Sequence, residues 1–301
     1  MTVANRSVYF GILLATVAAL IWAGNFIIAR GVYKQIQPVS LAFYRWLTAT
    51  IIILPGIKKI KVEWPVVKAS WHYVFWTSLT GISLFNTFVY IAGHYTTAIN
   101  LALIGTTSSP VMAIILARIF LKEKIGWNKL AGLTLCIIGI LFLLSQGNFR
   151  NLITISFSRG DAWMLVAAFC FAVYNTLVKK KPSSISPINF LFVTFSLGTI
   201  LLLPFFLWEI QHTSAIKWNI QLFMSILYLG AGASVVCFFL WNRAIETLGA
   251  GRTALFGNLI PIFSSLEAVI ILGEKFTWIH IVSMVIVFSG LLLANIRSGD
   301  R

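Results

Sequence analysis

The chain has 301 residues, of which 59% are hydrophobic and only 10% are charged, and its mean hydropathy is +0.90. A soluble domain carries about 25% charged residues, because much of its surface faces water. The composition therefore excludes an ordinary soluble protein and indicates a chain whose main solvent is lipid. The net charge of +15 does not indicate a nucleic-acid partner, because the cationic residues lie in short turns between apolar stretches and form no basic surface.

Ten apolar stretches follow one another along the chain. A helix needs about 20 residues to cross a hydrocarbon core ~30 Å thick, and the runs are continuous rather than alternating, which favours helices over a barrel. The first run is too long for a signal-peptide core, so we keep it as a span. The expected spans are residues 8–29, 37–57, 71–93, 97–120, 127–146, 160–180, 187–209, 219–243, 249–273 and 277–296.

The lysines and arginines predict how the chain lies in the membrane. If the amino terminus is cytoplasmic, the inside segments hold most of them, including Lys58, Lys59 and the run Lys179–Lys181. Cytoplasmic loops carry such an excess of positive charge. We therefore expect a multi-pass protein of the plasma (inner) membrane with both termini in the cytoplasm.

An internal repeat is the strongest signal in the sequence. At a constant spacing of 151 residues, Pro110 matches Pro261, and an E-K-x-x-W motif at Glu123 matches one at Glu274. Charged residues, tryptophan and proline in a fixed pattern indicate a true duplication. The repeat predicts two units, residues 1–147 and 148–301. Because each unit has five spans, an odd number, the second must be inverted relative to the first, and inverted repeats are typical of secondary transporters.

The motifs resemble a known family. W-A-G-N-F from Trp22, F-Y-R-W from Phe43, and the paired P…L-K-E-K-I-G-W and P…L-G-E-K-F-T-W segments are similar to those of EamA-type members of the drug/metabolite transporter superfamily. The resemblance implies ten helices around a central cavity lined mainly by helices one, three, four, six, eight and nine. It also implies transport, mostly export, of amino acids, other metabolites or drugs.

Two charged residues lie within expected spans, where charges are expensive and therefore candidates for function. Arg45 and Glu267 lie at similar depth, so one hypothesis is an ion pair that one protonation or substrate state breaks. The alternative is that Arg45 anchors its helix through carbonyls or extends outward, and that hydroxyls such as that of Ser264 hold Glu267. Both residues are candidates for coupling or gating.

Neutral polar residues supply the candidates for a solute cavity. Asparagine amides offer donors and acceptors to a zwitterion, and aromatic faces suit apolar groups or cations. The competing interpretation is hydrogen bonding between packed helices. The candidates are Asn25, Asn86, Tyr90, Tyr174, Asn175, Trp241, Asn242 and Asn258. Pro110 and Pro261 are hinge candidates, because proline removes a backbone donor inside a helix.

The sequence carries no catalytic or nucleotide-binding motif, and its three cysteines have no ligand spacing. We therefore expect no enzyme activity, no metal and no cofactor, with a lipid bilayer and a small-molecule substrate as partners. The function predicted is secondary transport, in the direction of export, of a small organic solute such as an amino acid or related metabolite. The alternatives are drug efflux, metabolite exchange, and, from other classes, a membrane scaffold or an intramembrane enzyme. Oligomeric state is not predicted.

Overall fold

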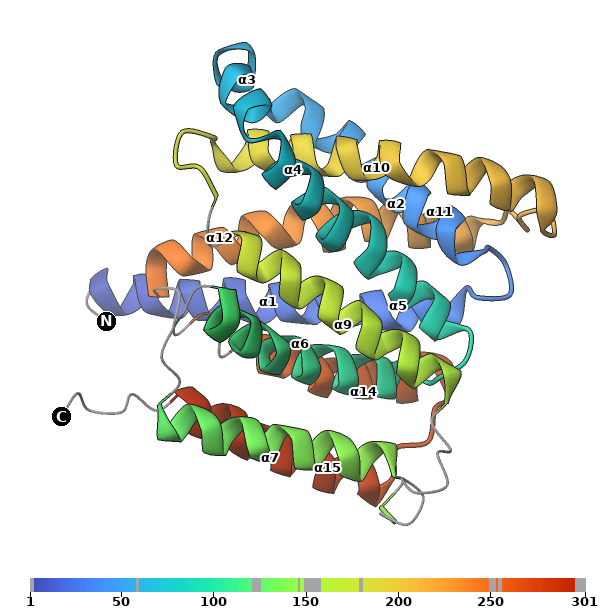
Figure 1. Cartoon of the computed structure of the whole chain (residues 1–301). Coiled ribbons are helices and arrows are strands. Elements are labelled where there is room, and N and C mark those ends of the chain that lie inside the picture. The colour runs from blue at the N-terminus through green and yellow to red at the C-terminus, as the bar shows by residue number, and fades with distance from the viewer. Residues whose placement is uncertain are drawn as a thin grey trace.

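The computed structural model describes residues 3–57, 60–120, 126–145, 147–148, 158–178, 181–248, 253 and 256–295. Within these ranges the chain is helical and contains no strand (Figure 1). The prediction of an all-α protein is thereby confirmed.

The helices follow the expected spans closely. Those of the first half are α1 (Val3–Gly31), α2 (Pro38–Ile53), η1 (Leu54–Gly56), α3 (Ile60–Ala69), α4 (Trp71–Ser78), η2 (Leu79–Leu84), α5 (Phe85–Gly93), α6 (Ala98–Phe120) and α7 (Trp127–Leu144). Those of the second half are α9 (Arg159–Val178), α10 (Pro187–His212), α11 (Ile220–Leu227), η3 (Tyr228–Val236), α12 (Cys237–Leu248), η4 (Gly257–Leu259), α14 (Ile260–Leu272) and α15 (Trp278–Asn295). The segments η2 and η3 are π-helical and join α4 to α5 and α11 to α12 without a break.

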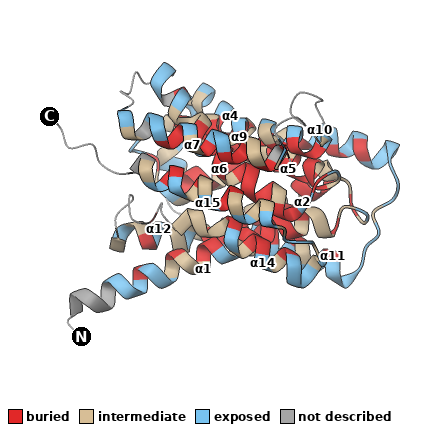
Figure 2. Cartoon of the chain, turned by 90° about the horizontal axis from the view of Figure 1, so that it is seen from below, coloured by how far each residue is buried: buried red, intermediate tan, exposed pale blue. Residues whose placement is uncertain are grey.

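Seven helical segments among the described residues are long and apolar enough to cross a membrane, and three shorter apolar helices lie where the remaining spans are expected. The three are Leu130–Leu143, Gly257–Leu272 and Trp278–Leu293. Figure 2 shows buried residues in the middle of the bundle and exposed ones around it. Many of the exposed residues are large and apolar; Ile270, for example, is 80% exposed. Such an outer surface is suited to lipid.

The helices run between two ends of the bundle (Figure 1). Helix α1 begins and α15 ends at one of them, which we call the terminal end. The connections from α1 to α2 and from α14 to α15 lie at the other, which we call the opposite end. The chain thus returns to the end at which it starts.

Helices α7 and α15 pack against each other through residues that the repeat relates. The Ser283 hydroxyl donates to the Gly139 carbonyl (2.8 Å), and the Cys136 thiol contacts the Val287 carbonyl (3.7 Å). A Cβ on Gly139 would meet the Val287 side chain, and a Cβ on Gly290 would meet the Cys136 backbone nitrogen. At the repeat spacing of 151 residues, Gly139 matches Gly290 and Cys136 matches Val287, so the two close approaches are equivalent under the repeat.

Helices α2 and α10 also pack side by side, and a glutamate supports the start of each. Glu209, near the end of α10, accepts hydrogen bonds from the Ser40 backbone N–H (2.6 Å) and hydroxyl (2.7 Å). Glu63, on α3, accepts from the Ser186 N–H (3.0 Å) and the Asn189 amide (2.8 Å). A carboxylate is well placed there, because the first N–H groups of a helix lack intrahelical acceptors.

Helix α3 was not expected from the sequence. The ten residues of α3 include Pro65 and the charged Lys61 and Lys68, so they form no apolar span. The sequence pattern alone is typical of a charged loop. Val67 is buried against the α4 and α10 side chains, while Trp64 is 46% exposed. An amphipathic helix of this kind suits a position along a membrane surface.

Candidate functional site

A cavity of about 290 Å³ lies in the middle of the bundle. This volume is at the lower limit of ~300–1,000 Å³ typical of small-molecule pockets. All six helical segments named by the family resemblance contribute, and α2 adds Arg45 and Trp46. The lining residues are Trp22, Asn25, Phe26, Arg45, Trp46, Gly81, Ile82, Phe85, Asn86, Gly105, Thr106, Ser109, Pro110, Phe171, Tyr174, Asn175, Ala233, Phe238, Gly257, Asn258 and Ile260.

The same residue spacing brings α1 and α9 to the cavity. Trp22, Asn25 and Phe26 of α1 are three and four residues apart, and so are Phe171, Tyr174 and Asn175 of α9. Residues at this spacing share one face of a helix. The repeat mates Asn25 and Asn175 therefore both line the cavity.

Arg45 is held on the cavity wall by four neutral side chains. Its Nη1 donates to the Asn25 side-chain carbonyl (2.5 Å), the Asn86 side-chain carbonyl (2.8 Å) and the Tyr90 hydroxyl (2.8 Å). Its Nε donates to the Ser234 hydroxyl (3.1 Å). Arg45 is buried, with 5% of the residue exposed, and its hydrogen bonds join α2 to α1, α5 and η3. Hydrogen bonds donated by a guanidinium group are charge-assisted and strong.

No described carboxylate lies within ion-pair distance of Arg45. Arg45 lines the cavity, and its second terminal nitrogen, Nη2, donates to no described residue. Trp46 and Ser109 also line the cavity, and the Trp46 indole nitrogen and the Ser109 hydroxyl are buried without a hydrogen-bond partner. The cavity therefore has a positively charged pole at Arg45.

The rest of the wall is mostly aromatic. Phe26, Phe85, Phe171 and Phe238 line the cavity around the charged pole. Phe85 and Phe171 stack with ring centroids 4.5 Å apart, at an interplanar angle of 24°. Such a wall offers apolar contact area but few hydrogen bonds.

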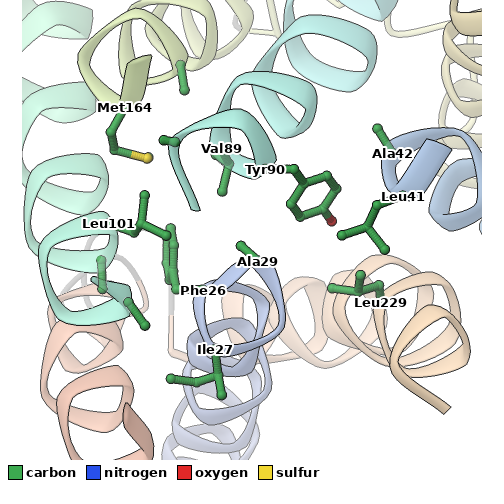
Figure 3. Close-up of a cluster of buried hydrophobic side chains, with 14 of the residues drawn as sticks. Phe26, Ile27, Ala29, Leu41, Ala42, Val89, Tyr90, Leu101, Met164 and Leu229 are labelled. Atoms are coloured by element: carbon green, nitrogen blue, oxygen red, sulfur yellow. The ribbon is translucent and has the colours of Figure 1, made fainter. Parts of the chain in front are cut away.

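Five of the predicted cavity residues line it: Asn25, Asn86, Tyr174, Asn175 and Asn258. The other three differ. Tyr90 lies behind the wall, almost fully buried, and projects from α5 toward α2 (Figure 3). Trp241 packs against Trp22 with ring centroids 5.0 Å apart. Asn242 is exposed and does not line the cavity, because it lies on the outward face of α12.

The expected ion pair between Arg45 and Glu267 is not formed. Glu267 lines a separate pocket between α1, α11, η3 and α14, and its Oε2 is buried without a hydrogen-bond partner. Equal depth in the membrane does not imply that two side chains face each other, because each helix also fixes the direction in which a residue points. The alternative explanations are not observed either. Arg45 donates to side-chain oxygens and to no described backbone carbonyl, and the Ser264 hydroxyl has no partner.

The two candidate hinge prolines differ in their surroundings. Pro110 lies inside the continuous helix α6 and lines the cavity. Pro261 lies in the first turn of α14, directly after the 3-10 turn η4. Proline is well tolerated in a first turn, where its missing N–H is not needed. Matched sequence positions therefore occupy different helical environments, and the hinge role stays a prediction.

Hydrogen bonds link helices at the opposite end of the bundle. Arg30 of α1 donates to the Gly93 carbonyl that ends α5 (3.1 Å). Glu274, from the repeated E-K-x-x-W motif, accepts from the first N–H groups of α6, those of Ala98 (2.8 Å) and Ile99 (3.2 Å). Its mate Glu123 lies outside the described residues. At the terminal end the cavity lining reaches Asn175, one turn before α9 ends at Val178, and Gly257, where η4 begins.

Sequence reasoning missed the aromatic wall and Trp46, because single apolar residues in apolar helices carry no distinguishing signal. A signal for part of it exists in the repeated three-and-four spacing on α1 and α9. Thr106 and Ser109 of α6 also line the cavity.

Comparison with known proteins adds independent information. The model of the EamA-like transporter family matches twice, at residues 9–145 and 158–296. A solved crystal structure covers 94% of this chain and 96% of its own with a TM-score of 0.62 and 16% sequence identity, a likeness of fold alone.

Relatives match over nearly their whole length. An uncharacterized transporter of Archaeoglobus fulgidus is 28% identical over 285 residues, which are 95% of this chain and 97% of the relative. A protein of Salmonella typhimurium named "Probable amino-acid metabolite efflux pump" is 26% identical over 293 residues, 93% of each chain.

Proposed function

Because the chain belongs to the EamA-like transporter family of the drug/metabolite transporter superfamily, we propose that it is a secondary transporter that moves a small organic solute through the central cavity by alternating access. Membership and the transporter-named relatives make it a multi-pass membrane transporter and not an enzyme. The solute, the mechanism and the site residues are our proposals.

The observation that carries the choice of solute is the unopposed charge of Arg45. A buried cation without a carboxylate partner is costly, and a bound anion offsets that cost. The free Nη2 edge can donate to a carboxylate, an arrangement that guanidinium groups favour. We therefore place a carboxylate group of the solute at Arg45, which lines the cavity.

The remaining wall describes the rest of the solute. The phenylalanines suit an apolar portion, and the Asn175 and Asn258 amides can accept from an ammonium group. The volume of about 290 Å³ limits the solute to a small molecule. An amino acid or closely related metabolite fits these features, and the printed name of the Salmonella typhimurium relative supports the same class.

Alternating access follows from a proposed inverted repeat of ten spans, with units at residues 1–147 and 148–301. Two observations support a pseudo-two-fold axis between the halves. The close approaches between α7 and α15 are related by the repeat, and a glutamate accepts hydrogen bonds at the start of both α2 and α10. In such proteins the two halves can exchange conformations around a fixed midplane site.

The direction of transport follows from the two ends. The hydrogen bonds of Arg30 and Glu274 support closure at the opposite end, while the cavity lining reaches the terminal end. The excess of lysine and arginine supports a cytoplasmic terminal end in the plasma membrane. The conformation is then one that loads solute from the cytoplasm, and we propose export.

Drug efflux is the second candidate function. The positive charge of the cavity distinguishes it from transport of a small carboxylate. Aromatic walls suit cationic drugs through cation–π contacts, but the Arg45 charge repels cations. A drug exporter would therefore be inhibited by lipophilic cations, whereas the proposed carrier would be inhibited by amino acids and other small carboxylates.

The test is counterflow of labelled solutes in liposomes that contain the purified protein. We expect saturable exchange of an amino acid or small carboxylate, competed by other carboxylates and not by cations. Asn175→Ala should weaken exchange, and Asn242→Ala, on an exposed face of α12, should not. Exchange competed only by cations would support drug efflux, and no exchange across a broad panel by folded protein would overturn the proposal.

A further inference from the structure

A second pocket, of about 330 Å³, lies beside the central cavity and contains Glu267. Helices α1, α11 and α14 and the π-helical segment η3 form its walls. We call it the Glu267 pocket. Its lining residues are Gly24, Ile27, Ile28, Gly31, Val32, Gln221, Ser225, Tyr228, Glu267, Ile271 and Leu272.

The surroundings of Glu267 contain no cation. Helix α1 contributes only glycines and aliphatic side chains, and α11 contributes the neutral Gln221 and Ser225. Segment η3 contributes Tyr228, the one other titratable group in the lining. Helix α6 also packs against α14 but contributes no lining residue. Among the described residues, nothing donates to Oε2 or pairs with the carboxylate.

Glu267 is half-buried, and its Oε2 is buried without a partner, which favours binding of something positive. Burying an ionised carboxylate without a partner costs several kcal/mol, about the cost that leads such groups to neutralise. A metal cation such as Ca²⁺ takes 6–8 oxygen ligands, and Mg²⁺ takes an octahedral set. The pocket offers far fewer, because Gln221 accepts from Gln35 (3.3 Å) and only Ser225 and Tyr228 add hydroxyls. A proton needs no further ligand.

The Glu267 pocket and the cavity share two walls. Tyr228 donates to the Ile21 carbonyl of α1 (2.8 Å). The next residue, Trp22, lines the cavity, and its indole nitrogen donates to the Ala233 carbonyl of η3 (3.0 Å). Ser234, which follows Ala233, accepts from Arg45. One face of α1 and of η3 therefore lines the Glu267 pocket, and another face of each lines the cavity that contains Arg45.

The two spaces point toward different ends of the bundle. The Glu267 pocket is lined by the last residues of α1 and α14, Gly31 and Leu272, and by Gln221 at the start of α11, which is exposed at the opposite end. The cavity instead reaches the terminal end. Water at the opposite end is thus the nearest source of a proton for Glu267.

From this geometry we propose that Glu267 is a proton-binding site separate from the solute cavity, and that its protonation is coupled to the solute site through the shared walls α1 and η3. This inference rests on the proposed transport function for its role, although the proton site itself does not. The carboxylate takes a proton from the opposite end and becomes neutral. It releases that proton when another conformation hydrates the pocket, so the protonation state biases the conformational equilibrium.

The proton site is tested with a probe that needs no solute. N,N′-Dicyclohexylcarbodiimide reacts with protonated carboxyl groups in apolar surroundings, and peptide mass mapping locates the adduct. We expect labelling at Glu267 that falls as pH rises. Labelling at this position should be absent in Glu267→Gln and retained in Glu267→Asp. It should also be retained in Glu274→Gln, a matched control whose carboxylate is held by two N–H groups.

The coupling is tested in the same proteoliposomes as the transport function. Glu267→Gln should keep solute counterflow but lose uptake driven by a pH gradient, by tenfold or more. Unlabelled Glu267 together with pH-driven uptake equal to wild type would overturn the inference. Labelled Glu267 without flux of any solute would support the proton site and overturn the transport function, so the two failures are distinguishable.

Discussion

The two charges within the spans, Arg45 and Glu267, have opposite surroundings. Arg45 donates four hydrogen bonds to side chains of three other elements, α1, α5 and η3, which fix its charge in place. Glu267 has an unpartnered buried oxygen in a pocket of mostly aliphatic side chains. A charge held in place by hydrogen bonds organises a site, whereas a carboxylate without such bonds is suited to change its charge. The difference indicates a division of work between recognising the solute and binding a proton.

The largest effect is expected from Arg45→Ala. It removes four hydrogen bonds and leaves the buried Asn86 side-chain carbonyl to find another partner, at a cost of about 3 kcal/mol or more in unfolding free energy. Counterflow should be lost. Thermal unfolding in detergent and counterflow measure the two effects. Arg45→Lys is the control, since it keeps the charge without the planar fork and should recover stability more than exchange. Wild-type exchange by Arg45→Ala would contradict the assigned role.

The next effect is expected from removing one acceptor from Arg45. Asn25→Ala leaves Nη1 with two acceptors and should cost about 1–3 kcal/mol, or roughly fivefold to a hundred-and-fiftyfold in the solute concentration for half-maximal exchange. The matched control is Asn242→Ala, because Asn242 is exposed and should change nothing. Equal effects of both substitutions would remove the distinction between wall and outer surface.

A smaller effect is expected from giving Glu267 a partner. Ser225→Asn places an amide donor in the Glu267 pocket and should favour the ionised carboxylate, as a hydrogen bond to the charged form does. We expect carbodiimide labelling at Glu267 to decrease severalfold at neutral pH. Ser225→Ala, which adds no donor, is the control. Unchanged labelling in Ser225→Asn would show that Glu267 does not respond to donors at this position.

The smallest effect concerns Glu63, a carboxylate outside the spans that, like Arg45, is held by several hydrogen bonds. Burial opposes its ionisation, but hydrogen bonds from Asn189 and Ser186 outweigh burial and lower its pKa. The stability it contributes is therefore present above its unfolded pKa of about 4.3 and is lost as pH falls through the lower folded value. Glu63→Gln should exchange amide hydrogens at the start of α10 faster than wild type at neutral pH. The two proteins should converge in acid, and a constant difference would contradict this.

Much of the fold was predictable because lipid imposes a simple rule. Long apolar runs must become helices, and each described helix between α1 and α15, apart from α3, lies at an expected span. Helix α3 escaped because its short amphipathic pattern resembles a charged loop. The π-helical segments η2 and η3 escaped because propensity does not distinguish a π turn from an α turn.

The site was predictable only in part, for a different reason. Polarity within a span identified Asn25, Asn86, Tyr174, Asn175 and Asn258, which line the cavity. It also identified Asn242, which does not. Depth along a helix can be read from residue number, but the direction of a side chain depends on packing between helices. The same lack of direction explains why Arg45 and Glu267 seemed a plausible pair.

The segments η2 and η3 occupy corresponding places in the two repeats, and both border the cavity, through Gly81 and Ile82 and through Ala233. A π turn holds one more residue than an α turn. If that extra residue moves along a helix, the stretch between its old and new positions rotates by about 100°, while the ends stay in place. Each repeat thus contains a π-helical segment in which such a shift of register can occur. It provides a way to turn Phe85 and Asn86 toward or away from a solute without bending the helix or breaking its contacts at either membrane surface.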